Sequence, residues 1–266
     1  MSYKFADIAK GPKDLLNDDY STSQTLKCKK NAGPVAVTIE TGRGEGGALT
    51  SKIGTKFNYG KLNIDKLQAT ANGGQVLETS LKFAPNVKVS FKSGKGADLG
   101  VDYTQGNFYG TAVLDVVEMS KFSTSACVSL PSGIKAGADA TYGLSGKTGV
   151  TGLNVGASYA TGSLFGVVTS VNKLSSVNLG LLYRVNPQVT VATMSSHSGD
   201  NALNLTAVGG SYKADFGTVK AKYTAGGVVS ASLIKDIAPK LTLTASGSAS
   251  SSDPISTFKY GLGITM

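Results

Sequence analysis

The chain has 266 residues, a formal net charge of +9 and 34 glycines, and only 16% of its residues are charged. Ordinary soluble domains carry about 25% charged residues, so this composition argues against the surface of a typical water-soluble protein. Apolar residues are spread along the whole chain, which argues against disorder. The two cysteines, Cys28 and Cys127, fit no metal-binding or redox spacing.

Residues 1–23 are expected to form an amphipathic helical segment followed by a linker. Phe5, Ile8, Pro12 and Leu15 recur near helical spacing, and charged residues occupy the other positions. Gly11-Pro12 should break the segment into two short pieces. Its mixture of Lys and Asp is not expected of a secretory signal peptide or a typical mitochondrial presequence. The helix could lie on a membrane surface or inside a pore, and the residues leave both placements open.

From about Thr25 onward, apolar residues alternate with polar residues over runs that end at short turns. One example is Val87–Phe91, where Val87, Val89 and Phe91 alternate with Lys88 and Ser90. This period of two indicates β-strands with one apolar and one polar face. The uncharged stretch 148–172 contains many glycines and hydroxyl residues, so it is not expected to be a membrane-spanning helix.

A chain of alternating strands joined by short turns can form either a soluble β-sandwich or a transmembrane β-barrel, and strand length distinguishes the two. Membrane-crossing strands need about 9–11 residues, whereas strands of soluble proteins average about 5–6. Allowing roughly 13 residues for a membrane strand and its turn, residues 24–266 would hold about 18 or 19 strands. The sequence therefore predicts one large transmembrane β-barrel over 24–266, with a soluble β-sandwich interaction protein as an alternative.

Both ends of the chain resemble one family. The ending from Lys259 to Met266 resembles the sorting signal of mitochondrial outer-membrane barrels: a polar residue, any residue, Gly, two residues, then hydrophobic, any and hydrophobic. The matching residues are Lys259, Gly261, Ile264 and Met266. The start resembles the N-terminal helix of voltage-dependent anion channels, the mitochondrial porins, and its matching residues are Phe5, Asp7, Ile8, Lys10, Lys13, Asp14, Leu15 and Leu16.

The resemblance implies a barrel of 19 strands whose first and last strands run parallel, with the N-terminal helix inside the pore. It implies a wide, weakly anion-selective, voltage-gated channel that passes ATP, ADP, phosphate and organic anions across the mitochondrial outer membrane. No cofactor is implied, and the implied partners are membrane lipids and weakly bound anions and nucleotides, with self-association left open. Two features depart from the family: Asn86-Val87-Lys88 stands where some members have Gly-Leu-Lys, and tryptophan is absent.

The polar face of the predicted strands would line the pore, and its bases outnumber its acids. Four acids are expected there, namely Asp98, Asp102, Asp115 and Asp139. Asp65-Lys66 interrupts an alternation, so either one charge faces lipid or a β-bulge intervenes, and Asp65 is the expected lipid-facing acid. The expected pore-lining bases are Lys27, Lys29, Lys52, Lys56, Lys88, Lys92, Lys121, Lys135, Arg184, Lys220, Lys222 and Lys259.

Other functions find little support in the sequence. Gly42–Gly47 fits G-x-G-x-x-G, but a strand-like alternation follows it where a dinucleotide site needs a helix. His197 is the only histidine and is expected in an exposed turn, so neither a catalytic triad nor a zinc site is predicted. Singly spaced charges without interleaved aromatic residues do not indicate nucleic-acid binding. A mitochondrial protein-import pore of the same superfamily remains an alternative.

Overall fold

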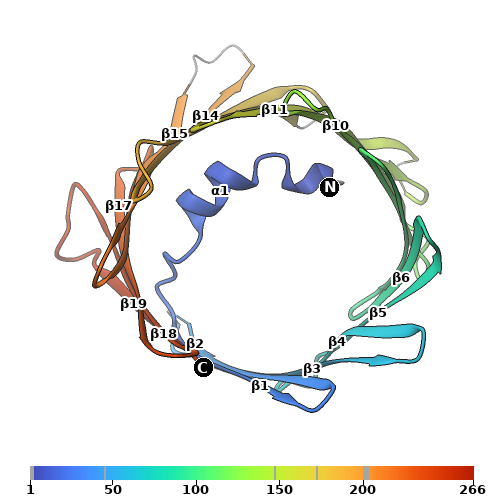
Figure 1. The fold of residues 1–266 in the computed structure, drawn as a ribbon, viewed down its shortest axis with the longest axis horizontal. Helices are drawn as coiled ribbons and strands as arrows, with labels where there is room; N and C mark the ends of the chain where they lie inside the picture. The colour runs from blue at the N-terminus through green and yellow to red at the C-terminus, as the bar shows by residue number, and fades with distance from the viewer. Residues whose placement is uncertain (1–2, 45, 147, 172, 200–203) are drawn as a thin grey trace.

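The computed structural model describes residues 3–44, 46–146, 148–171, 173–199 and 204–266. Its strands form a single closed sheet of 19 strands, and the N-terminal helical segment lies inside the ring (Figure 1). The predicted all-β barrel and the predicted strand number are both confirmed.

Each strand pairs antiparallel with the next along the chain, and short turns join most of them. The strands are β1 Gln24–Ala32, β2 Val35–Arg43, β3 Leu49–Tyr59, β4 Leu62–Thr70, β5 Gln75–Ala84, β6 Val87–Ser93, β7 Ala97–Gln105, β8 Phe108–Asp115, β9 Lys121–Ser129, β10 Ile134–Gly143, β11 Gly149–Thr161, β12 Leu164–Val171, β13 Ser176–Arg184, β14 Val189–Ser198, β15 Asn204–Ala214, β16 Gly217–Thr224, β17 Val228–Ala238, β18 Leu241–Ser250 and β19 Lys259–Thr265.

The period-two patterns place apolar side chains on the outside of the barrel. On β7, Leu99, Val101 and Tyr103 point outward and are about 40% exposed, while Asp98 and Asp102 lie on the inner parity. Strands with apolar exteriors and polar interiors are typical of transmembrane barrels, in which lipid covers the outer face. Both buried hydrophobic clusters of the described residues involve the N-terminal segment and the inner wall, so the sheet has no second layer to cover its outer face.

The barrel closes through a parallel pairing of β1 with β19, as the odd strand number requires. Leu26 is paired with Ile264, and Lys27 with Thr265. The pairing continues to Met266, whose amide donates to the Lys27 carbonyl at 2.8 Å and whose carbonyl accepts from the Lys29 amide at 2.6 Å. Backbone hydrogen-bonding groups along the facing edges of β1 and β19 are thus paired with each other, and no open sheet edge is exposed to lipid at this seam.

The register of this seam can be tested by a disulfide. In a Cys28→Ser, Cys127→Ser background, Leu26→Cys and Ile264→Cys should crosslink efficiently under mild oxidation, because facing residues of neighbouring strands lie within disulfide reach. Leu26→Cys with Tyr260→Cys is the matched control, displaced by four residues or roughly 13 Å along the strand. A crosslink of the displaced pair alone would contradict the parallel register, and electrophoresis under non-reducing conditions distinguishes the two.

The N-terminal segment comprises a 3₁₀ turn, Phe5–Asp7, and the helix α1, Lys10–Asn17. The predicted division into two pieces is correct, but its predicted place at Gly11-Pro12 is wrong, because the break falls at Ile8–Ala9. Pro12 lies in the first turn of α1, where a backbone amide has no intrahelical acceptor and proline is tolerated. Among the described residues, no helix is long and apolar enough to cross a membrane.

Candidate functional site

The helix α1 rests with its apolar face on the inner wall of the barrel. Leu16 is 1% exposed and packs with Leu15 against Ala192 of β14 and Ala207 of β15. Lys13 and Asn17, on the opposite side of the helix, are exposed to the lumen. Amphipathic patterning therefore fixes which face of the helix meets the wall.

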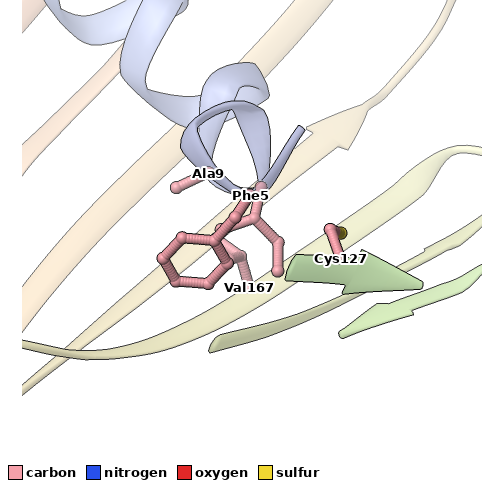
Figure 2. Packing of buried hydrophobic residues seen from close by; sticks show 5 residues of the cluster. Phe5, Ala9, Cys127 and Val167 are labelled. Atoms are coloured by element: carbon pink, nitrogen blue, oxygen red, sulfur yellow. The ribbon is translucent and has the colours of Figure 1, made fainter. Parts of the chain in front are cut away.

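A second apolar cluster holds the segment before α1. Phe5, Ile8 and Ala9 are buried against Cys127 of β9 and Val167 of β12 (Figure 2). Cys127 is only 1% exposed, so the N-terminal segment seals its side chain from the lumen. Together with the Leu16 cluster, this contact attaches the segment to the wall on both sides of the break at Ile8–Ala9.

Glycines in the wall make room for these side chains. A Cβ added to Gly209 would lie 2.9 Å from Leu16 Cδ2, and one added to Gly137 would lie 2.9 Å from Phe5 Cδ2. At Gly180 the added Cβ would lie 3.4 Å from Pro12 Cγ. Carbon atoms normally pack at about 3.5–4.0 Å, so Gly137 and Gly209 permit an approach that a side chain would prevent.

Charged contacts fix both ends of the segment. The Asp19 carboxylate accepts from Lys220 Nζ at 2.6 Å, and Lys222 Nζ lies 4.5 Å from the centre of the Tyr20 ring. At the other end, Lys135 Nζ lies 3.5 Å from the centre of the Tyr3 ring. Burial, and secondarily the Asp19 carboxylate, raise the pKa of Tyr20 to about 12, so its ring remains neutral at physiological pH.

These contacts identify the inner face of the sheet, and the register extends that face around the barrel. In the strand register, Lys27 and Lys52 lie on either side of Glu40 on the neighbouring strands. Lys88 and Lys92 lie opposite Asp102 and Asp98 in the same sense. By this register all twelve bases expected in the pore lie on the inner parity, but Lys135, Lys220 and Lys222 contact the N-terminal segment instead of an open lumen. The four expected acids lie on the inner parity as well.

Acids that the sequence analysis missed lie among the lysines of the wall that the helix leaves uncovered. The Glu40 carboxylate forms ion pairs with Lys52 Nζ at 2.6 Å and with Lys27 Nζ at 3.4 Å. The Glu78 carboxylate forms an ion pair with Lys92 Nζ at 3.4 Å. The alternation Ala36, Thr38, Glu40 against Val37 and Ile39 was a signal for Glu40, since it places that carboxylate on the polar parity. The inner wall is therefore an alternating network of charges with an excess of bases.

The predicted lipid-facing position of Asp65 is wrong. Asp65 Oδ2 lies 3.8 Å from Lys88 Nζ, and Asp65 lines a cavity on the inner wall together with Lys66. A β-bulge between Ile64 and Lys66 inserts one extra residue, so the alternation changes parity there. As a result Leu62, Ile64, Leu67 and Ala69 all face outward, and both charges avoid the lipid.

The residues of the expected sorting signal all lie at the closing strand. Lys259 and Gly261 are on the inner parity of β19, Ile264 is on the outer parity, and Met266 follows the strand. Gly261 adjoins the Ser21 carbonyl of the linker, which the Ser246 hydroxyl also contacts. His197 is exposed, as expected, but it lies near the end of β14 and not in a turn. Of the Gly42–Gly47 stretch, residue 45 lies outside the described residues.

A closed barrel with an apolar exterior, a charged inner wall and a helix docked within the lumen defines a membrane channel of the porin class. Comparison with known proteins agrees with this class. The eukaryotic porin family model matches residues 3–261, and the chain belongs to that family.

Curated relatives and solved structures extend the comparison. The chain is 29% identical to a mitochondrial outer membrane porin of Neurospora crassa over 74% of each chain. It is 28% identical to mitochondrial outer membrane porin 5 of Oryza sativa subsp. japonica over 98% of this chain and 96% of the relative. A double mutant of Rh. blastica porin shares the fold at a TM-score of 0.51 and 11% identity, covering 82% of this chain and 89% of that one. The protein is a β-barrel channel for small solutes in the mitochondrial outer membrane.

Proposed function

We propose that the protein is a weakly anion-selective, voltage-gated channel for small metabolites, with ATP, ADP, phosphate and organic anions as permeants. The observation that carries the selectivity is the excess of lysines on the inner wall left uncovered by the helix. Lys27, Lys29, Lys52, Lys56, Lys88 and Lys92 lie there on the inner parity of β1, β3 and β6. A wall of one predominant sign concentrates ions of the opposite sign.

The strength of this selectivity is limited by salt and by the acids of the same wall. Charges are screened over about 8 Å at physiological ionic strength, so an ion in the centre of a wide lumen experiences only part of the field. Glu40 and Glu78 also neutralise three of the lysines at 2.6–3.4 Å. A modest bias for anions, and not a strict filter, is therefore expected.

The docked helix is the element proposed to respond to voltage. It carries Lys10, Lys13 and Asp14 inside the lumen, where the membrane potential falls, and it is held to the wall mainly by side-chain contacts. Moving one elementary charge through the full potential changes the free energy by about 2.3 kcal/mol per 100 mV. Movement of the helix charges through part of this field would be enough to shift an equilibrium between docked and displaced positions.

The proposed selectivity is tested by reversal potentials of the purified protein in planar bilayers under a KCl gradient. The expected sign is that of a channel more permeable to chloride than to potassium, and the bias should shrink toward 1 M salt, where screening shortens to about 3 Å. Conductance with a cation-selective reversal potential would contradict the proposal.

The remaining proposals concern partners and targeting. The outer face is proposed to contact membrane lipids, and self-association is left open. No nucleic-acid partner and no catalytic role is proposed. Among the described residues, no group of three or more His, Cys, Asp or Glu side chains could hold a metal ion. We further propose that Lys259, Gly261, Ile264 and Met266 act as the sorting signal for insertion, in addition to closing the barrel.

A further inference from the structure

A cavity of about 340 Å³ lies on the inner wall formed by β1–β4. These strands lie across the lumen from α1 (Figure 1). Four lysines line it, namely Lys27, Lys52, Lys56 and Lys66, together with the acids Glu40 and Asp65. The size falls within the range of about 300–1,000 Å³ that is usual for small-molecule sites.

The acids of this cavity neutralise its lysines unequally. Glu40 bridges Lys27 and Lys52, at 3.4 and 2.6 Å, and so fixes these two ammonium groups close together. Asp65 is paired at 3.8 Å with Lys88, which is not part of the cavity lining. Within the described part of the chain, neither Lys56 nor Lys66 has a carboxylate within 4.0 Å.

The β-bulge of β4 creates this arrangement. It turns Asp65 and Lys66 inward together, and a regular strand would have sent one of them to the lipid side. Gly54 on β3 adds no side chain beside them, and Thr38 and Gln68 supply a hydroxyl and an amide to the same lining. The result is a concave surface with two unpaired ammonium groups and neutral hydrogen-bond donors, which is suited to an anion with several negative oxygens.

We infer that this cavity is a polyphosphate subsite, which binds the phosphate chain of a nucleoside di- or triphosphate during its passage and does not recognise the base. Lys56 and Lys66 bind the phosphates directly, while the Lys27–Glu40–Lys52 bridge supports them from β1–β3. Its lining residues include no aromatic side chain on which a base could stack. The inference rests on the proposed function, since it names a place in the permeation path where that anion pauses.

The test measures the block of chloride current by inorganic tripolyphosphate, ATP and GTP in planar bilayers at fixed, low KCl. In the unaltered protein the three anions should reduce the current at concentrations within about threefold of one another, because each presents a triphosphate chain. A preference of tenfold or more for ATP over tripolyphosphate would overturn the base-blind subsite.

Two matched double variants then localise the block. Lys56→Gln with Lys66→Gln removes two charges from the cavity, and Lys92→Gln with Lys121→Gln removes two charges from the inner wall outside it. The cavity variant should raise the half-blocking concentration of tripolyphosphate on the order of tenfold, since two partly exposed charge contacts are lost. The control variant should raise it by less than about threefold through the general field alone.

Equal shifts in the two double variants would overturn the subsite while leaving the channel proposal intact. Absence of any conductance in the unaltered protein would instead contradict the proposed function itself. Where the cavity variant yields no channels, the single variant Lys66→Gln is measured, and an unchanged half-blocking concentration in it likewise overturns the inference.

Discussion

Truncating Leu16 should expose Cys127, although the two side chains belong to different clusters on the inner wall. In Cys28→Ser protein, Cys127 is the only thiol, and a water-soluble maleimide should label it slowly because it is 1% exposed beneath the N-terminal segment. Leu16→Ala removes a buried side chain that packs on Ala192 and Ala207, a change that typically costs about 2–5 kcal/mol.

Leu16→Ala destabilises the docked state relative to the undocked state, because the undocked helix does not make these contacts. A loss of about 2 kcal/mol raises the undocked population roughly 30-fold, and the labelling rate of Cys127 should rise by a similar factor. Mass spectrometry of samples quenched at intervals measures this rate directly.

The matched control is Lys13→Ala, which changes an exposed residue of the same helix to the same small side chain. It should leave the labelling rate within about twofold, because no buried contact is lost. Fast labelling of the unaltered protein would contradict the docked position of the segment. Unchanged labelling in Leu16→Ala would show that the two parts of the segment undock independently at Ile8–Ala9.

The architecture could be predicted because its signal is repeated in every strand. A period of two persists wherever one face meets lipid and the other meets the lumen, and short turns permit only neighbouring strands to pair. The parallel closing pair, however, rested on the resemblance to a family with 19 strands. Alternation alone does not distinguish 18 strands from 19, since one extra turn residue per hairpin changes the count.

On the inner wall, the predictions that were wrong or missing each concern single residues. Asp65 was misplaced because a bulge interrupts the alternation in the sequence but keeps the apolar side chains on the outer face. A regular strand with one charge facing lipid has the same sequence, so the sequence does not distinguish the two. Glu40 and Glu78 lie on the polar parity of their strands, so the period-two alternation is enough to predict both as inner-wall acids. The contacts of Lys135 with Tyr3 and of Lys220 with Asp19 depend on where the helix docks, which no local pattern specifies.

Reversing four lysines of the uncovered wall should abolish or invert the selectivity. Replacing Lys52, Lys56, Lys88 and Lys92 by Glu changes each position by two charges and leaves Glu40, Asp65 and Glu78 without these partners. The inner wall of β2–β7 then becomes predominantly acidic, since Asp98 and Asp102 lie on the same face. Reversal potentials in a KCl gradient should therefore move from anion-selective to neutral or cation-selective.

The control for this reversal must keep the number of charged side chains constant. Replacing the same four residues by Arg retains every positive charge and should preserve the anion bias, so any change seen only in the Glu variant reflects the sign of charge. The difference between the two variants should also shrink as KCl rises to 1 M, since the Debye length falls from about 8 to about 3 Å. Equal reversal potentials in the Glu and Arg variants at every salt concentration would mean that the four lysines face lipid or lie outside the permeation path. That result would contradict the inner-wall placement on which the selectivity proposal depends.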